Sequence, residues 1–504
     1  MPSLGRRSFL ARGSIAVAGL ALPFSALWSR GARAEGWGEL VPDPDQILDL
    51  PPGFSYRIID EAGQTMDDGY LVPGKPDGMA CFEGEPGTLV VMRNHEVGTG
   101  DANNGAYGHD EAPPEAYDPL AFGGVTRIVL DAEDFSRISS NLVLTGTVRN
   151  CAGGPSPWGW LSCEETVQLD HGFVFLCSTQ ASSVATPQRI PGYGRFRHEA
   201  AAVDPETSYC YLTEDQPNGA FYRFVPKDPE NDPFEGTLQA MRVVGFPNAD
   251  TSSGMYVGQI LEIEWVDIAN PAPLTDTLRG QAASMGAATI SRGEGLWHFD
   301  DSVYIASTSG GPAYRGQIFR LVDGPDGGIL ELIAQAEDAD GLDHPDNITV
   351  APWGQVFIAE DGVGDQYIRA IDDHGQVVDF ARNAMSSGEV AGVCFSPDGR
   401  AMFLNLQHEG ISLVVTGPFT ECPEPEPETG DETGLDDGLT DDTGRAAIEP
   451  PEPEPTPGKG VRLDDDGGLT GCGCSTEDSV PGGAALVGAT VLGLRAAKAS
   501  DTDD

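Results

Sequence analysis

The chain has 504 residues, of which 39% are hydrophobic, and a formal net charge of −50. This length suits several domains or one large repeat architecture. Because nucleic-acid binding requires clustered Lys and Arg that neutralise phosphates, the charge excludes a nucleic-acid-binding protein. It fits a protein that binds multivalent cations, or one adapted to salty surroundings.

Residues 1–34 have the pattern of a twin-arginine signal peptide. Arg6-Arg7 supplies the twin arginines, an apolar run follows at 15–28, and Ala32-Arg33-Ala34 matches a small-x-small cleavage site. The apolar run is short for a transmembrane anchor, which is the alternative. We therefore expect export through the twin-arginine translocase to a periplasmic, cell-surface or extracellular location.

Short apolar runs separated by turn residues fill the chain from about residue 40 to residue 419. Runs with strand character lie at 88–92, 125–130, 173–176, 208–212 and 303–306. Gly, Pro, Asp and Asn punctuate these runs, and long helical periodicity is scarce. The pattern predicts an all-β fold.

An internal repeat refines that prediction. Segments 198–215, 346–361 and 392–407 each contain a strand, a turn with Pro, Asp or Gly, a second strand and a polar or acidic end. Such a segment is typical of a β-propeller blade, whose inner strand lies at a central channel. We predict a six-bladed β-propeller with insertions over residues 35–419, with a β-sandwich as the alternative.

The composition changes after residue 419. Residues 420–470 are rich in Pro, Glu and Asp and are expected to form an extended acidic linker. Residues 471–504 contain Gly471-Cys-Gly-Cys-Ser475 and a short apolar stretch, which together resemble the Cys-containing C-terminal sorting signals of myxobacterial surface proteins. Acidic residues replace the basic cluster that usually ends such signals, so surface anchoring and a disordered acidic tail both stay open.

One thiol and two carboxylates lie side by side in Trp158-Gly-Trp-Leu-Ser-Cys-Glu-Glu-Thr166. In a strand, Cys163 and Glu165 would face one way and Glu164 the other. A buried carboxylate needs a partner, and a thiolate combined with carboxylates suits iron or zinc better than magnesium. The chain has nine cysteines, so at least one lacks an intrachain disulfide partner, and we take Cys163 as a metal thiolate. A buried structural cysteine beside two solvated glutamates is the other interpretation.

Further acidic and amide residues lie at blade-like positions, where strand ends would converge on the channel: Asn94, Glu96, Glu199, Glu214, Asp215, Glu294, Asp346, Asn347, Glu360 and Asp361. Converging carboxylates repel one another, and cations offset that repulsion. Oxygen-only groups suit calcium. Arg292 stands beside Glu294, where a guanidinium would form a salt bridge or grip a phosphate or carboxylate of a substrate. His95 and His198 are expected to be structural.

The chain resembles the PhoX-type alkaline phosphatases, a group of exported proteins. The resemblance rests on the twin-arginine leader and on motifs that span most of the chain before the acidic linker: Asn94-His-Glu96, Pro157-Trp-Gly-Trp-Leu-Ser-Cys-Glu-Glu165, Gly194-Arg-Phe-Arg-His-Glu199, Arg292-Gly-Glu294, Pro345-Asp-Asn347 and Phe395-Ser-Pro-Asp-Gly-Arg-Ala-Met-Phe-Leu-Asn-Leu-Gln407. The Cys-Glu-Glu motif with its Trp-Gly approach is the most specific of these motifs.

This resemblance implies a six-bladed propeller that hydrolyses phosphate monoesters at a cluster of Fe(III) and Ca2+ ions. Carried onto this chain, it makes Cys163, Glu199 and Glu294 ligands of the iron cluster and Arg292 the holder of the phosphoryl group. Candidates for calcium or shared ligation are Glu164, Asp215, Asp346 and Glu389. The chain departs from the family pattern at Gly293, where many members have Pro, and at Gly388, where many have Cys.

The expected function is therefore that of an exported, monomeric, metal-dependent alkaline phosphatase that acts on small phosphate esters through positioning and charge stabilisation. No Gly-x-Ser-x-Gly or P-loop motif argues for a serine nucleophile or a nucleotide site. The alternatives are another calcium-binding propeller, such as a lactonase, and a non-catalytic surface binding protein.

Overall fold

The structure, a computed structural model, describes residues 37–420 except 338–340 and 373. These described residues belong to one compact unit. The predicted signal peptide at 1–34, the tail at 471–504 and all but the first residue of the linker at 420–470 lie outside the described residues.

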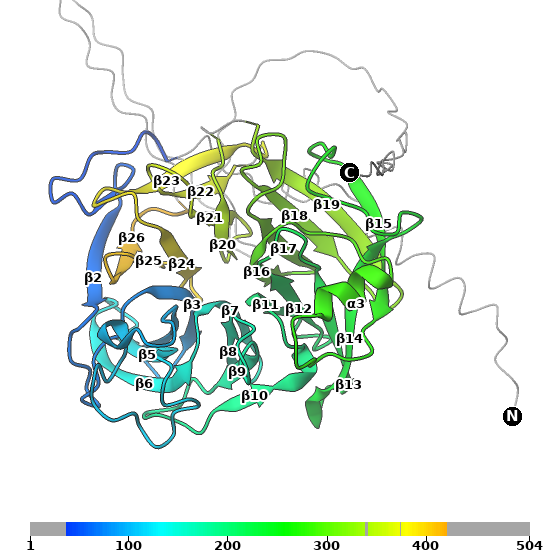
Figure 1. Ribbon diagram of the computed structural model, residues 1–504. Helices are drawn as coiled ribbons and strands as arrows, with labels where there is room; N and C mark the ends of the chain where they lie inside the picture. The colour runs from blue at the N-terminus through cyan, green and yellow to red at the C-terminus, as the bar shows by residue number, and fades with distance from the viewer. Residues whose placement is uncertain (1–36, 338–340, 373, 421–504) are drawn as a thin grey trace, which may run out of the picture. The chain divides into compact units, whose positions relative to one another are not determined.

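Strands dominate this unit, so the predicted all-β fold is confirmed (Figure 1). Helical structure in the described part is limited to α3 (Leu278–Ser284) and the 3-10 turns η2 (Ala102–Asn104) and η3 (Pro191–Tyr193). Within the same residues, no helix is long and apolar enough to cross a membrane.

Two antiparallel sheets come first in the chain, each built by successive hairpins. The first has the order β3 (Pro76–Glu83), β4 (Thr88–His95), β5 (Gly123–Asp131) and β6 (Arg137–Thr147). The second contains β7 (Asn150–Ser156), β8 (Gly159–Glu164), β9 (Val174–Cys177) and β10 (Gln188–Ile190).

A nine-stranded sheet follows. Its first half contains β11 (His198–Val203), β12 (Cys210–Glu214), β13 (Tyr222–Asp228) and β14 (Asp232–Val243). Its second half contains β16 (Gly293–Phe299), β17 (Ser302–Ser307), β18 (Gln317–Val322) and β19 (Gly328–Gln335). The strand β15 (Ile260–Asp267) pairs with both β14 and β19 and so joins the halves.

The last two sheets each take a strand from the start of the described chain. One contains β20 (Pro345–Val350), β21 (Val356–Glu360), β22 (Tyr367–Ile371) and β23 (Val377–Asn383), with β1 (Leu48–Asp49) at its edge. The other contains β24 (Val390–Phe395), β25 (Ala401–Leu406) and β26 (Ile411–Thr416), with β2 (Ser55–Glu61) as its outer strand. The pairing of β2 with β26 closes the structure, because it joins a strand near the start of the described chain to the last strand.

Six strands, hereafter the inner strands, contact one another in a ring: β3, β7, β11, β16, β20 and β24. The sheets extend outward from this ring, as Figure 1 shows, which is a propeller-like arrangement. It replaces the β-sandwich alternative, in which two sheets face each other. In the described part of the chain, hydrogen bonding defines five sheets, so the six-blade count stays a prediction.

Apolar side chains fill the space between neighbouring sheets. An aromatic cluster joins the two ends of the described chain, with Trp37 and Phe54 packing on Phe380 at ring distances of 4.9 and 5.1 Å, and Phe419 on Phe54 at 5.0 Å. Edge-to-face rings at these distances pack favourably. In the described part the cysteines are free thiols, namely Cys81, Cys151, Cys163, Cys177, Cys210 and Cys394.

Every inner strand has an irregular register close to its start. The shifts fall between Pro76 and Met79, Asn150 and Gly153, His198 and Ala201, Gly293 and Leu296, Pro345 and Ile348, and Ala391 and Cys394. Such bulges bend a strand and re-aim its side chains. The feature therefore repeats around the ring at the same end of every inner strand.

Candidate functional site

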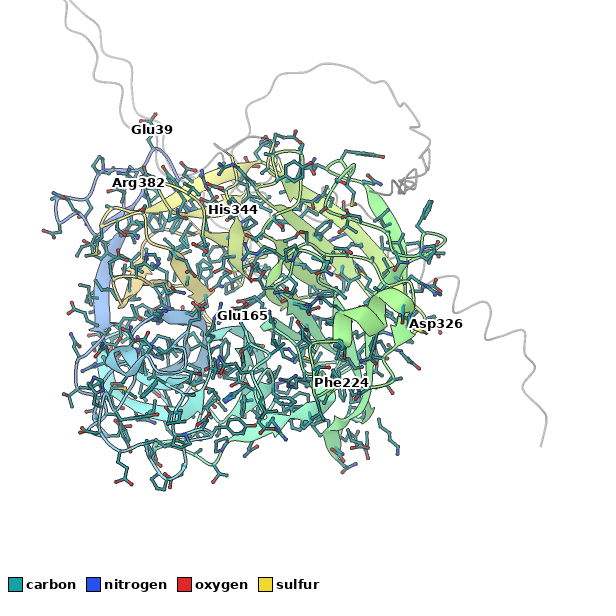
Figure 2. The ribbon with its side chains drawn as sticks, in the orientation of Figure 1. Glu39, Glu165, Phe224, Asp326, His344 and Arg382 are labelled. Carbon is teal, nitrogen blue, oxygen red and sulfur yellow. The ribbon has the colours of Figure 1, made fainter. Side chains whose placement is uncertain are left out.

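A cavity of about 90 Å³ lies where the inner strands begin. Its lining is almost entirely polar and consists of Asp77, Glu96, Arg149, Cys151, Glu165, Glu199, Asp215, Arg292, Glu294, Thr308, Asp346, Asp361 and Glu389. Figure 2 shows Glu165 near the centre of the strand ring. These residues lie in the inner strands, or directly before or after an inner strand or the strand that pairs with it.

One set of lining residues, the inner ring, comes from the inner strands themselves. The second residue of β3, β7, β11, β16 and β20 supplies Asp77, Cys151, Glu199, Glu294 and Asp346. Glu389, which directly precedes β24, completes the set. Each of these positions lies at or next to the irregular register of its strand, which explains why one residue per strand faces the cavity.

A second set, the outer ring, occupies the residue directly after the strand that pairs with each inner strand, and all of its members except Gln407 line the cavity. Its members are Glu96, Glu165, Asp215, Thr308, Asp361 and Gln407, which follow β4, β8, β12, β17, β21 and β25. Gln407 donates hydrogen bonds to Asp77 at 3.0 Å and to Glu96 at 3.4 Å. The cavity is therefore built from two repeating positions of one structural unit.

The inner-ring carboxyl groups are buried and close to one another. Burial, followed by repulsion from neighbouring carboxylates, raises the pKa of Asp77, Glu199, Glu294 and Glu389 well above the usual range. Burial and the nearby Asp361 raise the pKa of Asp346 to about 7. Burial also raises the pKa of the Cys151 thiol well above its usual range. Because their negative charges would repel one another, these buried carboxyl and thiol groups favour binding of a cation or a proton.

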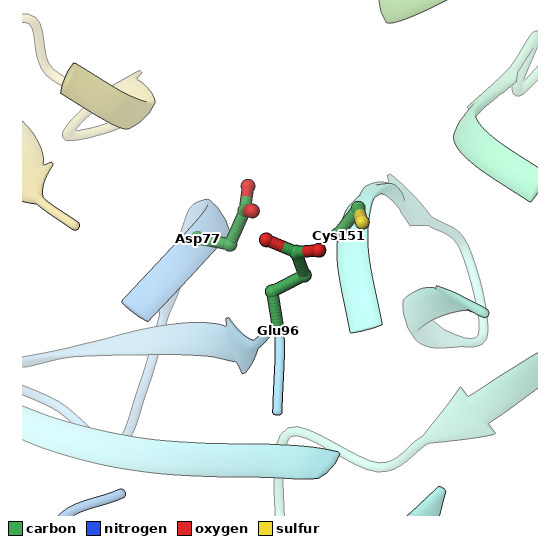
Figure 3. Close-up of side chains that lie close together, drawn as sticks. All are labelled: Asp77, Glu96 and Cys151. Atoms are coloured by element: carbon green, nitrogen blue, oxygen red, sulfur yellow. The ribbon is translucent and has the colours of Figure 1, made fainter. Parts of the chain in front are cut away.

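Among the described residues, three overlapping groups of side chains have the geometry to hold cations. The ligand atoms of Asp77, Glu96 and Cys151 lie within 4.8 Å of one another (Figure 3). The same holds for the groups Asp77, Asp346 and Glu389, and Glu199, Glu294 and Asp346. Asp77 Oδ1 is buried without a hydrogen-bond partner, which fits a position that a cation would fill.

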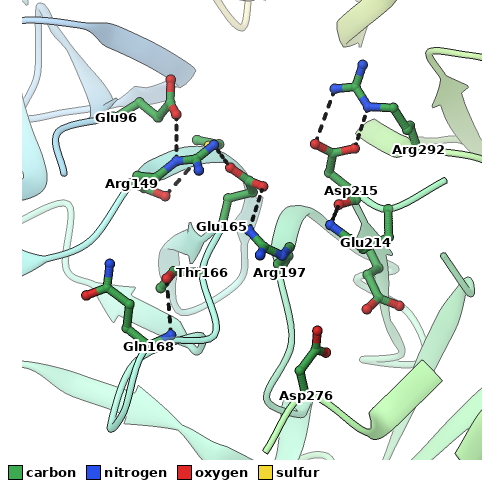
Figure 4. A network of polar contacts seen from close by, with 12 residues as sticks. Glu96, Arg149, Glu165, Thr166, Gln168, Arg197, Glu214, Asp215, Asp276 and Arg292 are labelled. Atoms are coloured by element: carbon green, nitrogen blue, oxygen red, sulfur yellow. Dashed lines mark hydrogen bonds and ion pairs between the residues drawn. The ribbon is translucent and has the colours of Figure 1, made fainter. Parts of the chain in front are cut away.

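Arginines neutralise much of the outer ring, as Figure 4 shows. Arg149 donates to Glu96 at 3.0 Å and also pairs with Glu165, while Arg197 lies 3.8 Å from Glu165. Arg292 donates from Nε to Asp215 at 2.7 Å and from Nη2 to Glu294 at 2.7 Å. The arginines thus surround a cluster of carboxylates and neutralise only part of its negative charge.

The structure brings most of the predicted site residues together. Glu199, Asp215, Arg292, Glu294, Asp346 and Glu389 all line the cavity, as do Glu96, Glu165 and Asp361. Glu214 and Glu360 are instead bound by Arg279 and Arg369 at 2.9 and 3.1 Å. His95 and His198 are buried outside the lining and hydrogen-bond to backbone carbonyls of Gly74 and Gly194.

Cys163 and Glu164 do not belong to the cavity, and this corrects the sequence prediction. Cys163 packs in an apolar cluster with Val174 and Leu212. Glu164 accepts hydrogen bonds from His171 at 2.6 Å and from three backbone N–H groups, of Val148, Gly172 and Phe173. Both residues lie in β8, which is the second strand of its sheet and directs Cys163 into the packing between sheets. The thiol in the cavity is Cys151.

Four lining residues were missed, namely Asp77, Arg149, Cys151 and Thr308. A repeated triplet could have found the first three, since a basic residue stands two positions before each of the first five inner-ring residues: Lys75-Pro-Asp77, Arg149-Asn-Cys151, Arg197-His-Glu199, Arg292-Gly-Glu294 and His344-Pro-Asp346. Lys75, Arg149, Arg292 and His344 also share a positive φ of 46° to 55°. The triplet therefore has a common backbone shape as well as a common composition.

Comparisons with known proteins identify a family and a similar fold. A family model described as alkaline phosphatase PhoX matches residues 35–142 and 136–410. The structure of Pseudomonas fluorescens PhoX in complex with vanadate, a transition state analogue, is 18% identical, with a TM-score of 0.59, and the match covers 77% of this chain and 98% of that chain. No curated protein sequence matches this chain.

Two further solved structures show more distant likeness. A protein of unknown function from Bacteroides thetaiotaomicron is 12% identical, with a TM-score of 0.40 and coverage of 72% of this chain and 76% of that chain. A gluconolactonase from Xanthomonas campestris is 12% identical, with a TM-score of 0.35 and coverage of 77% and 100%. The family match spans most of the described residues, and the chain belongs to the PhoX alkaline phosphatase family.

Proposed function

We propose that this protein hydrolyses phosphate monoesters in the strand-end cavity and that it depends on Fe(III) and Ca2+ held by the inner ring. The observation that carries the proposal is a buried thiol, Cys151, among buried carboxyl groups with raised pKa. A structural core gains nothing from such a cluster, because uncompensated buried acids are destabilising.

The donor set fits both kinds of ion. The group of Asp77, Glu96 and Cys151 combines sulfur with oxygen ligands and suits iron. The groups Asp77, Asp346 and Glu389, and Glu199, Glu294 and Asp346, offer oxygen only and suit calcium or ligands shared with iron. Asp215 is a further candidate from the outer ring. Bound ions would supply Lewis acidity and charge stabilisation.

Arg292 is the residue that we assign to the substrate phosphoryl group. Its side chain is 36% exposed, lines the cavity and is fixed by Asp215 and Glu294. A fixed guanidinium can donate two parallel hydrogen bonds to phosphoryl oxygens and stabilise charge on them. Glu294 holds this guanidinium and belongs to a candidate cation group of the inner ring, so it links substrate binding to the cation position.

The repeating cavity positions also support six blades. The nine-stranded sheet contains two inner strands, β11 and β16, each with its own bulge and its own inner-ring and outer-ring residue. Treating β11 to β14 and β16 to β19 as separate blades joined by β15 gives one blade for each inner strand. Gly293 and Gly388, the departures from the family pattern, lie next to Glu294 and Glu389 in the sequence, and both acids still line the cavity.

The setting of this activity is proposed from the sequence alone. The leader at residues 1–34 would deliver a folded, metal-loaded protein through the twin-arginine translocase to the periplasm or beyond. The tail at 471–504 would anchor it to the cell surface or remain unattached, and the enzyme would act as a monomer on small phosphate esters.

Metal analysis and enzyme assay of the same exported sample test the proposal. We expect iron together with calcium, and faster hydrolysis of a phosphate monoester than of a diester at alkaline pH. Cys151→Ser should lose iron and most activity, whereas Cys163→Ser, the matched control in the core, should keep both. Calcium without iron, and no monoester hydrolysis, would favour a lactonase-like or binding propeller instead.

A further inference from the structure

We propose that Arg149 is a second anion-holding residue of the cavity, which acts with Arg292 on the phosphoryl oxygens of the substrate and of product phosphate. This inference rests on the proposed function. It assigns a role to a residue that the sequence did not single out.

Arg149 and Arg292 occupy equivalent places in the repeating unit. Each directly precedes an inner strand, β7 or β16, and each stands two positions before an inner-ring residue. Both have left-handed backbones, with φ of 52° and 48°, and both line the cavity. Their side chains are 41% and 36% exposed, so each guanidinium remains accessible from the cavity.

The two arginines approach the cavity from either side of β11. In Figure 4 they lie on two sides of a space that Glu165 and Asp215 border. The inner strands β7 and β16 both contact β11. An anion between these strand ends would therefore meet two guanidiniums that come from different directions. Two such forks can reach more phosphoryl oxygens than one fork can.

The carboxylates that hold these arginines also belong to the candidate cation groups. Arg149 donates to Glu96, a member of the group with Asp77 and Cys151. Arg292 donates to Glu294, a member of the group with Glu199 and Asp346. A cation that takes Glu96 or Glu294 as a ligand weakens the carboxylate's bond to its arginine. The freed donors are then available to an anion, so cation binding and anion binding support each other.

Arg197 provides a matched control. It has the same place in the triplet, directly before β11, and it also pairs with Glu165, at 3.8 Å. Unlike Arg149, it does not line the cavity and does not have a positive φ. If the charge near Glu165 were all that mattered, Arg149 and Arg197 would be interchangeable.

The test is the binding of inorganic phosphate to metal-loaded protein, measured by calorimetry and as product inhibition. Arg149→Gln should weaken phosphate binding by about tenfold to a hundredfold, the range expected for lost charge-assisted hydrogen bonds. Arg149→Lys should recover part of the affinity, since it keeps the charge and loses the fork. Arg197→Gln should bind phosphate as the wild type does, and iron and calcium contents should stay unchanged in all three variants.

Two results would overturn the inference. Phosphate affinity of Arg149→Gln within twofold of the wild-type value, at unchanged metal content, would show that Arg149 only neutralises Glu96 and Glu165. Equal weakening by Arg149→Gln and Arg197→Gln would show a general charge effect. A wild-type protein that neither binds phosphate nor hydrolyses monoesters would instead overturn the proposed function, and the role of Arg149 with it.

Discussion

Asp77 and Asp346 occupy the same position in two inner strands and bring carboxylate oxygens to within 4.8 Å of each other. Each follows a proline that begins its strand, and each lies within a stretch of irregular register. The two residues come from distant parts of the chain, so the closed ring of sheets creates their contact. Their mutual repulsion makes the folded protein sensitive to pH and to cations.

In chelator, stability should fall as pH rises, and Asp346 should account for part of that loss. Its pKa is raised from 3.8 to about 7, so the folded protein keeps a proton that the unfolded chain releases. A state that binds more protons loses stability as pH increases. Between about pH 5 and pH 8, the free energy of unfolding measured in urea should fall by about 2–3 kcal/mol less in Asp346→Asn than in the wild type. Equal losses in both proteins would contradict this assignment.

Arg292→Lys should separate charge from geometry in substrate binding. Lysine keeps the positive charge but cannot reproduce the two-pronged contact that Asp215 and Glu294 fix. We expect kcat/KM for a phosphate monoester to fall at least about tenfold. Arg242→Lys is the control, because Arg242 pairs with Glu264 outside the cavity and should leave the kinetics unchanged.

His171 should stabilise the protein mainly at low pH. Burial disfavours its charged form, but hydrogen bonds with Glu164 and Asp118 outweigh burial and raise its pKa above 6.5. This contribution is complete below the unfolded pKa and is lost as pH rises through the folded pKa. Thermal unfolding of His171→Gln against the wild type should therefore show a larger loss of Tm at pH 6 than at pH 9. A loss that does not change with pH would mean that the imidazole acts only through packing.

The inner strands approach one another too closely for a side chain at Gly154. A Cβ atom there would lie 1.7 Å from the carbonyl oxygen of Ala201 in β11. Gly154→Ala should cost about 2–4 kcal/mol in urea unfolding, because backbone must shift. Gly280→Ala in α3, which meets no atom within 4 Å, should instead stabilise by about 0.5–1 kcal/mol. Similar effects at both positions would contradict the close packing of β7 and β11.

The strands and most of the cavity acids could be predicted because both follow local rules. Alternating apolar runs and turn residues mark the strands, and the cavity acids stand at strand ends, as Asp361 does directly after β21. The thiol could not be placed in the same way. The segment Asn150–Ser156 is rich in glycine and does not look like a strand, whereas Cys163 lies in a clear one. A bulge, which sequence periodicity does not reveal, turns Cys151 into the cavity.

Sheet count was equally hard to predict from sequence. The strand β15 has no equivalent in the repeat segments, yet it pairs with β14 and β19 and merges two four-stranded units into one sheet. The repeat is still recognisable in the inner strands. Each has its bulge and its cavity-lining residue, whichever strands pair at the outer edge of its sheet.

Removal and return of the metals tests the central claim most directly. Phosphate monoester hydrolysis should disappear when the purified protein is stripped with chelator, and it should return when Fe(III) and Ca2+ are added back together. The variant Asp77→Asn alters a residue shared by two candidate cation groups, so its hydrolysis activity should not return when the metals are added back. Full activity in stripped protein with no detectable iron or calcium would contradict a metal-dependent phosphatase in this cavity.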